Sequence, residues 1–310
     1  MRLFVTGCSG YLAQRLITAS LGNPKIEWIG GCDIRKPATV SGWNFFELDI
    51  RSEQLKTTLR ENRVDTVAHL AWVFNPTHNQ PLEYEIDVNG SRNVLKAVEN
   101  ARVPYLLYLS STTAYGPHPD NPSIFDEAYP RRGHDSYLYS KYKAEVDSIV
   151  LEFIDQHPST SVFMIRACIV LGPRTSNIVT RMTQLPYVFG VRGYNPPMQF
   201  IHEEDIERLL SWAVVEKPVG VYNVAGKGTI QFSTLIEKLQ KNGMWLPPWL
   251  LYPSLGISWK LNLLPFPPSI LDFIRYPWVA STTKFEAAYK FEIRYSSTDA
   301  LLAYAATQKK

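Results

Sequence analysis

Short apolar runs alternate with amphipathic stretches along the first half of the chain. Runs of strand length occur at residues 3–5, 26–32, 45–48, 66–70, 105–109 and 161–165. Among the segments between them, one carries Val146, Ile149, Val150 and Phe153 at i, i+3, i+4 and i+7, which is the spacing of one helix face. Strands that alternate with helices predict an α/β fold with a parallel, doubly wound sheet.

This alternation ends at Gly172-Pro173. We predict a first domain over residues 1–173 and a smaller, substrate-binding lobe over 174–310, with the segment 199–226 returning to the first domain. Within the lobe, residues 246–278 are dense in Pro, Trp, Leu and Phe, and the prolines exclude a single helix. This segment could cover a pocket, a partner subunit or a membrane surface, or it could form the core of the lobe.

A glycine turn directly follows the first apolar run. Gly7 and Gly10 lie between that run and an amphipathic stretch that begins at Leu12. A strand, a glycine turn and a helix start form an anion site, because free backbone N–H groups face a pyrophosphate and glycine permits close approach. The turn therefore predicts a dinucleotide site, although an ordinary strand–turn–helix unit would look the same.

Asp33 closes the second apolar run. An acidic residue about 20 or more positions after the glycine turn can bind the adenosine ribose diol. Arg35 and Lys36 could instead meet the 2′-phosphate of NADP. We expect NAD rather than NADP, because a carboxylate repels that phosphate.

The composition excludes several classes of protein. The 310 residues are 45% hydrophobic and 20% charged, with a net charge of +3 and no basic run, so we expect no nucleic-acid partner. No apolar run reaches the roughly 18 residues of a membrane span. We expect no signal peptide, because the first residues already form a strand pattern. Three cysteines without metal spacing predict a reduced, cytoplasmic compartment, and the six scattered histidines predict no metal site.

Two overlapping Tyr-x-x-x-Lys patterns start the long helix, Tyr137 with Lys141 and Tyr139 with Lys143. Residues i and i+4 share a helix face, and Ser111 ends the fifth strand. A free tyrosine has a pKa of about 10, which a lysine and a cationic nicotinamide would lower. Such a tyrosine could take a proton from a substrate hydroxyl held by Ser111. A chance surface pattern is the alternative.

The motifs described above, from the glycine turn to the Tyr-x-x-x-Lys patterns, occur along the chain in one fixed order with four further segments. These segments are His69-Leu70-Ala71, Val88-Asn89, Tyr115-Gly116 and residues 200–205. In this order the chain resembles the extended short-chain dehydrogenase/reductases, the NAD-dependent epimerase/dehydratase family, and most closely a bacterial subgroup of sugar-epimerase-like proteins. The resemblance implies a Rossmann domain with bound NAD and a substrate-binding lobe. In that family a catalytic Ser or Thr lies four residues before the Tyr of Tyr-Gly, and a glutamate follows the catalytic lysine by four. Because Glu145 follows Lys141 by four, the resemblance implies Ser111, Tyr137 and Lys141 as catalytic residues.

Further site residues are expected on the same basis. The expected cofactor contacts are Gly7, Ser9, Gly10, Tyr11, Leu12, Asp33, Ile34, Arg35, Asp49, Ile50, Leu70, Ala71, Trp72, Asn89, Leu109, Ser110, Tyr137, Lys141 and Ala167. The expected substrate contacts are Thr112, Thr113, Asn177, Arg181 and Met198. We also expect a small-molecule substrate and a homodimer.

The chain departs from the family where a substrate would bind. The third motif glycine is Ala13, a small change, but a substrate-side asparagine is replaced by Ile169 and a diphosphate-binding arginine by Met198. We expect an NAD-dependent epimerase or dehydratase that acts on a sugar hydroxyl, with a nucleotide sugar as the first candidate. A hydroxysteroid-dehydrogenase-like ketoreductase or alcohol dehydrogenase with an apolar substrate, and a non-catalytic NAD(P)-binding sensor, are the alternatives.

Overall fold

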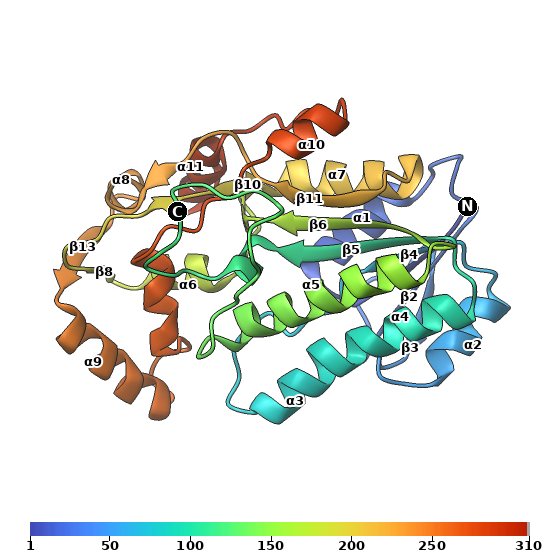
Figure 1. Cartoon of the computed structure of the whole chain (residues 1–310), viewed down its shortest axis with the longest axis horizontal. Coiled ribbons are helices and arrows are strands. Elements are labelled where there is room, and N and C mark those ends of the chain that lie inside the picture. The colour runs from blue at the N-terminus through green and yellow to red at the C-terminus, as the bar shows by residue number, and fades with distance from the viewer. Residues whose placement is uncertain (309–310) are drawn as a thin grey trace.

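The computed structural model describes residues 1–308 and is built on one seven-stranded parallel sheet (Figure 1). From one edge to the other, its strands are β11 (Gly220–Val224), β6 (Ser161–Ala167), β5 (Tyr105–Ser111), β4 (Thr66–His69), β1 (Arg2–Thr6), β2 (Trp28–Asp33) and β3 (Asn44–Glu47). The chain winds from β1 outward to β3 and then restarts at β4 on the other side of β1. In such sheets a ligand binds beyond the carboxyl ends of the strands at this point of reversal.

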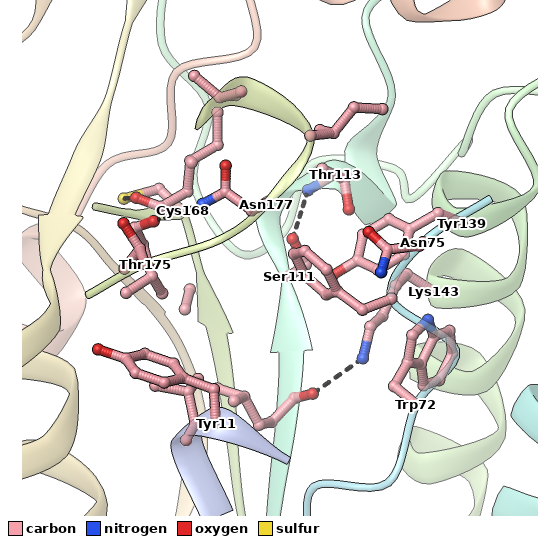
Figure 2. A pocket seen from close by; sticks show the side chains of 18 of the residues that line it. Tyr11, Trp72, Asn75, Ser111, Thr113, Tyr139, Lys143, Cys168, Thr175 and Asn177 are labelled. Carbon is pink, nitrogen blue, oxygen red and sulfur yellow. Dashed lines mark hydrogen bonds between the residues drawn. The ribbon is translucent and has the colours of Figure 1, made fainter. Parts of the chain in front are cut away.

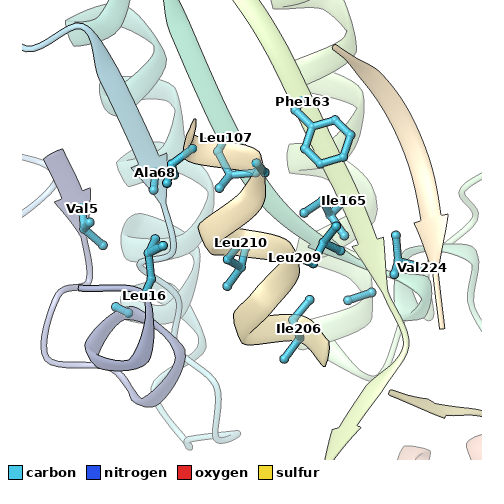
Figure 3. Packing of buried hydrophobic residues seen from close by; sticks show 14 of the residues in the cluster. Val5, Leu16, Ala68, Leu107, Phe163, Ile165, Ile206, Leu209, Leu210 and Val224 are labelled. Carbon is cyan, nitrogen blue, oxygen red and sulfur yellow. The ribbon is translucent and has the colours of Figure 1, made fainter. Parts of the chain in front are cut away.

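Two helices cover one face of the sheet, α1 (Tyr11–Ser20) and α7 (Glu203–Glu216). Leu16 of α1 and Leu209 of α7 are buried in one cluster with Val5, Leu107 and Ile165 of the strands (Figure 3). The sheet side chains of this cluster are apolar because parallel strands covered on both faces have no solvated side.

The other face is covered by α2 (Gln54–Glu61), α4 (Gly90–Asn100) and α5 (Leu138–Gln156). Val146 and Val150 of α5 are buried there with Val94 of α4 and with Val67 and Leu106 of the sheet. A short helix, α3 (Gln80–Tyr84), passes through a π-helical turn at Glu85–Asn89 into α4. The predicted doubly wound α/β fold is thus confirmed.

The remaining segments build a smaller lobe at the carboxyl end of the sheet (Figure 1). Its elements are β7 (Ile169–Leu171), α6 (Ile178–Gln184), β8 (Tyr187–Val191), β9 (Pro197–Met198), β10 (Phe200–His202), β12 (Ile230–Gln231), α8 (Phe232–Lys238), β13 (Asn242–Leu246), α9 (Pro248–Lys260) and α11 (Ser297–Thr307). The helix α10 (Thr283–Ala288) instead packs on β11, and its Phe285 is buried in the main-sheet cluster. There are also two 3₁₀ turns. Thr112–Tyr115 directly follows β5, and Pro268–Ile274 lies in the lobe. A separate core cluster, with Phe232, Leu251 and Leu301 among its members, holds the lobe together.

The segment 199–226 is divided between the two parts of the molecule. Its last strand, β11, pairs with β6 in the main sheet, and α7 covers that sheet, whereas β10 pairs with β7. The domain boundaries themselves stay a prediction. Residues 246–278 form no single helix: α9 ends at Lys260, and a 3₁₀ turn follows after a loop. No helix within residues 1–308 has both the length and the apolar character needed to cross a bilayer.

Candidate active site

The glycine turn lies at the carboxyl end of β1, where the sheet reverses its strand order. Gly7 has a φ of +68°, and a Cβ built on it would lie 2.5 Å from the Cα of Ala71. Both facts require glycine at this position. Gly10 caps α1 and offers no side-chain hydrogen bond to it, so the first N–H groups of α1 are left for another acceptor.

Asp33 lies beside this turn, at the end of β2. Its carboxylate accepts hydrogen bonds from the backbone N–H groups of Ser9 and Arg35, each at 3.1 Å. Asp49, after β3, is instead engaged by Arg51, whose guanidinium donates to the carboxylate at 2.6 to 3.1 Å. This hydrogen bonding lowers the pKa of Asp49.

One pocket of about 380 Å³ extends from the glycine turn to the smaller lobe (Figure 2). The side chains of Ser111, Tyr139 and Lys143 face those of Cys168, Thr175 and Asn177 across it. The expected site residues that line it are Gly7, Gly10, Tyr11, Leu12, Leu70, Trp72, Leu109, Ser110, Ser111, Thr113, Tyr137, Ala167, Asn177 and Met198. The expected residues that do not line it are Ser9, Asp33, Ile34, Arg35, Asp49, Ile50, Ala71, Asn89, Lys141, Thr112 and Arg181.

Several of the residues outside the pocket have structural contacts. Ala71 packs against Gly7, and Ile50 packs against Gly90. Asn89 donates its side-chain amide to Glu85 at 2.8 Å. These contacts make Ala71, Ile50 and Asn89 part of the scaffold around the pocket rather than of its wall.

Tyr139, Lys143 and Ser111 form the polar centre of the pocket. The Lys143 ammonium donates to the carbonyl of Leu109 at 3.0 Å and lies 3.5 Å from the centre of the Trp72 ring. Burial raises the pKa of Tyr139, and the neighbouring Ser111 hydroxyl lowers it. Ser111 in turn accepts a hydrogen bond from the N–H of Thr113 at 3.2 Å. A serine, a tyrosine and a lysine therefore meet at the carboxyl end of β5.

Lys143 is a buried cation with carboxylates near it. Burial lowers its pKa, while Asp87 and Asp147 act in the opposite direction. Asp87, on the π-helical turn, is buried, and burial raises its pKa. Its carboxylate accepts a hydrogen bond from the N–H of Val73 at 2.7 Å, which ties the pocket-lining segment after β4 to α4.

The structure does not bring the predicted pair, Tyr137 and Lys141, together. Tyr137 is the N-cap residue of α5 and has extended dihedrals, so its side chain does not leave the helix axis in the direction of a residue within the first turn. Its ring packs against Phe273 with ring centres 5.2 Å apart, at the lobe end of the pocket. Lys141 is exposed, on the solvent side of α5 with Ser148 and Glu152. The predicted placement of Lys141 in the site is therefore wrong.

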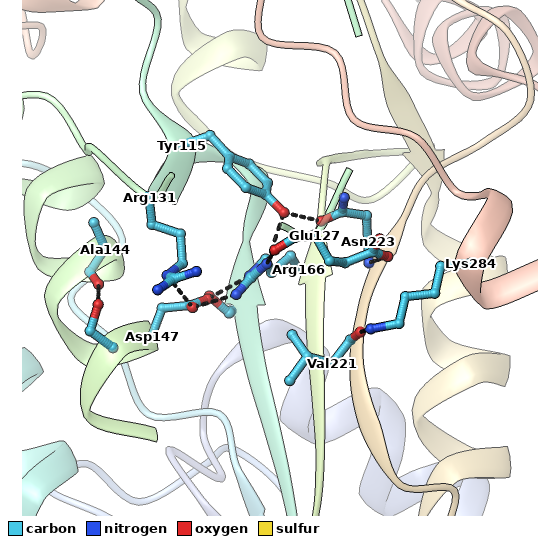
Figure 4. A network of polar contacts seen from close by, with 11 residues as sticks. Tyr115, Glu127, Arg131, Ala144, Asp147, Arg166, Val221, Asn223 and Lys284 are labelled. Atoms are coloured by element: carbon cyan, nitrogen blue, oxygen red, sulfur yellow. Dashed lines mark hydrogen bonds and ion pairs between the residues drawn. The ribbon is translucent and has the colours of Figure 1, made fainter. Parts of the chain in front are cut away.

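The acidic residue four positions after the lysine also differs from the prediction. Glu145 lies near the surface and accepts a hydrogen bond from Tyr84 at 2.9 Å. Asp147, four residues after Lys143, is fully buried and receives Arg166 through two nitrogens at 2.7 and 2.8 Å (Figure 4). Ser110 donates to the same carboxylate at 2.9 Å. Asp147 therefore joins α5 to β5 and β6 directly behind the site.

The lobe end of the pocket, opposite the glycine turn, is formed by segments that lie far apart in the sequence and were not predicted to meet. The lining residues missing from the prediction include Phe74, Asn75, Cys168, Ile178, Met182, Ile270, Phe273, Ile274 and Trp278. Four of these belong to the apolar stretch 246–278, whose composition was the available signal. The others lie in loops and in the short helix α6, which carry no motif.

Known proteins share sequence or overall fold with this chain. A protein of Mycobacterium tuberculosis without an assigned function is 22% identical over 97% of this chain and 82% of its own length. An N-acetyl-α-D-glucosaminyl-diphospho-ditrans,octacis-undecaprenol 4-epimerase of Escherichia coli O157:H7 is 32% identical, over 52% of this chain and 49% of its own. The crystal structure of UDP-glucose 4-epimerase from Thermus thermophilus in complex with NAD has a TM-score of 0.75, with 19% identity over 99% of this chain and 98% of that one.

A family model supplies the assignment. The model of the NAD dependent epimerase/dehydratase family matches residues 3–225, from the first strand through the whole main sheet. This span includes the glycine turn, Asp33, Ser111 and both Tyr-x-x-x-Lys patterns. The family predicted from the order of the motifs is confirmed, and the chain belongs to the NAD dependent epimerase/dehydratase family.

Proposed function

We propose that this protein binds NAD and catalyses hydride transfer at a hydroxyl-bearing carbon of its substrate, with Tyr139 as the acid–base group. The observation that carries the proposal is the meeting of Ser111, Tyr139 and Lys143 in one pocket with the glycine turn. This pair replaces Tyr137 and Lys141 as the proposed catalytic tyrosine and lysine.

The residues around the glycine turn fit the cofactor. Gly7 lets the turn pack closely against Ala71, and the first N–H groups of α1, which begins after Gly10, are available to a pyrophosphate. Asp33, beside the turn, is suited to a ribose diol and would repel a 2′-phosphate, so NAD is proposed over NADP. The indole N–H of Trp72, a pocket residue, is buried without a hydrogen-bond partner within residues 1–308, and a ligand could satisfy it. When bound, NAD supplies a two-electron acceptor that takes a hydride from carbon.

The chain's own residues supply the proton chemistry. Ser111 would hold the substrate hydroxyl, and the Tyr139 oxygen would receive its proton as the carbon–hydrogen bond is lost with its two electrons. The buried tyrosine alone is a poor base, because burial raises its pKa. The positive charge of Lys143 favours the phenolate, and its remaining N–H donors would hold the cofactor's ribose. For reduction of a ketone, the same proton returns from Tyr139 to oxygen.

The identity of the substrate stays a prediction. A sugar, and a nucleotide sugar in particular, finds support in the similar proteins, two of which are named as sugar 4-epimerases. The presence of Ser111, Tyr139 and Lys143 in one pocket argues against a non-catalytic NAD(P)-binding sensor. The homodimer and the cytoplasmic location also stay predictions.

Replacement of each tyrosine by phenylalanine tests the proposed chemistry. NADH consumption would be followed with carbonyl substrates of two classes, a UDP-4-keto sugar and the uncharged bicyclic ketone trans-1-decalone. Tyr139→Phe should lower kcat about 10²–10⁴-fold, because a positioned acid–base group contributes that much. Tyr137→Phe removes a hydroxyl from the same pocket and should cost about tenfold or less. Loss of activity in Tyr137→Phe alone, or no NADH consumption by the wild type with either class, would contradict the proposal.

A further inference from the structure

The lobe end of the pocket, opposite the glycine turn, is apolar. Its wall includes Met182, Met198, Phe273, Ile274 and Trp278. Met198 is 3% exposed and Phe273 is 4% exposed, so both side chains are fixed in the lobe's core and present carbon and sulfur to the pocket. Any substrate group that enters this end loses its water and meets mainly methylene, methyl and aromatic surface.

Among the pocket-lining residues within 1–308, Lys143 has the only basic side chain, and no lining residue is acidic. The Lys143 ammonium is at the other end, where it donates to Leu109 and lies over the Trp72 ring. An anion that leaves water without a cation or several hydrogen-bond donors is strongly disfavoured. A diphosphate at the lobe end would find no cation there.

Two polar side chains at this end, those of Asn177 and Thr175, are committed to the protein itself. Asn177 caps α6: its side-chain oxygen accepts from the N–H of Thr180 at 3.0 Å, and its amide donates to Val170 at 2.8 Å. Thr175 donates to the carbonyl of Gly172 at 2.9 Å. The Thr113 hydroxyl, by contrast, is buried without a partner within residues 1–308. Such a set can serve an uncharged hydroxyl or carbonyl but not a phosphate.

Arg275 follows the pocket-lining Ile274 and is one alternative source of positive charge in the lobe, but its side chain is already engaged. Its guanidinium donates to the hydroxyls of Tyr194 at 3.1 Å and Tyr252 at 3.5 Å. It also lies 4.7 Å from the ring centre of Tyr194 and 4.9 Å from that of Tyr276. Arg275 does not line the pocket. Three tyrosines therefore hold this cation within the lobe, away from a bound substrate.

We infer that the substrate of this site is an uncharged secondary alcohol or the corresponding ketone with a predominantly apolar body, and not a nucleotide diphosphate sugar. The inference rests on the proposed function for the reaction itself. The carbon of the alcohol gives a hydride to oxidised NAD, and the hydroxyl proton goes to Tyr139. The products are therefore the ketone, reduced NAD and a proton held by Tyr139. The apolar body would occupy the space between Met198 and Phe273.

Equilibrium binding tests the inference separately from the chemistry. The protein loaded with oxidised NAD would be titrated calorimetrically with trans-1-decalone and with UDP-glucose, because a ketone cannot be reduced by oxidised NAD. We expect the wild type to bind the decalone at least about tenfold more tightly than UDP-glucose. Binding of UDP-glucose at least as tight as that of the decalone, or no binding of the decalone, would overturn the inference. A failure of the proposed catalytic role of Tyr139 would leave this result unchanged and would appear only in turnover.

Two matched Met→Arg variants sharpen the test. Met198→Arg places a cation at the lobe end, and should shift the ratio of the two affinities toward UDP-glucose by about tenfold or more. Met244→Arg adds the same charge to the surface of the same lobe, where Met244 is 38% exposed and outside the pocket, and should leave the ratio unchanged. An equal shift in both variants would overturn the inference. Should Met198→Arg not fold, the wild-type comparison still decides.

Discussion

The two sides of helix α5 carry nearly the same residues and have different environments. On the inner side, Tyr139, Lys143 and Asp147 follow one another at intervals of four and touch the pocket or the sheet. On the outer side, Lys141 and Glu145 repeat the lysine–acid spacing, but Lys141 is exposed and Glu145 is half-buried. The comparison teaches that a motif's spacing is fixed by sequence, whereas its chemistry depends on which helix face meets the sheet.

The largest difference between the two sides concerns stability. Asp147→Asn should lower the free energy of unfolding by about 3–5 kcal/mol, because Arg166, 1% exposed, would keep its charge without a buried counter-charge. Glu145→Gln, the matched change on the outer side, should alter it by about 0.5 kcal/mol or less. Urea unfolding of both variants measures this, and similar losses in the two would mean that the sides are not distinguished by burial.

A smaller difference concerns the dependence of stability on pH. Burial lowers the pKa of Lys143 to about 7 from an ordinary value near 10.5, so between these values the unfolded chain binds more protons than the folded one. The free energy of unfolding therefore rises with pH across this window. Lys143→Met removes this contribution. The variant also lacks the cation that lowers the pKa of Asp87, so this buried carboxyl ionises at higher pH and at a greater cost to the folded state. Both effects increase the stability of the wild type relative to the variant as pH rises.

The wild type should consequently gain stability relative to Lys143→Met as pH rises from 7 toward 10. Chemical unfolding at a series of pH values gives the difference between the two proteins at each pH. Lys141→Met is the control, because the Lys141 side chain is exposed, and its difference from the wild type should stay constant. A constant difference for Lys143→Met would show that this lysine is solvated in the folded protein.

The sequence contained enough information to choose the inner side. Val146, Val150 and Phe153 mark the buried face of α5, and successive residues turn by about 100°. Lys143 and Asp147 lie on or beside that face, whereas Lys141 is about 200° from Lys143. The prediction relied instead on a glutamate four residues after the lysine, whereas the residue four positions after Lys143 is an aspartate, Asp147. The strands, the turn after the first strand and the family were predicted correctly, because each depends on local pattern or on the order of motifs. The catalytic role of Ser111 stays a prediction.

The lobe end of the pocket could not be derived in this way. Its walls combine residues from five separate parts of the chain, near 74, 168, 178, 198 and 273, and their meeting depends on how the lobe packs on the sheet. Asn177 illustrates the limit. Its residue type suggests a substrate contact, but its side chain is used to cap α6 and to bind Val170, which only the folded structure shows.

The affinity for NADH of one matched pair of lysine variants tests the central claim most directly, because it needs no substrate. Lys143→Met should weaken NADH binding by about tenfold or more, since a charge-assisted hydrogen bond contributes roughly 1.5–3 kcal/mol. Lys141→Met, with the same change two residues away on the outer side, should bind NADH as the wild type does. Weaker binding in Lys141→Met together with unchanged binding in Lys143→Met would contradict the assignment of the inner side of α5 to the active site.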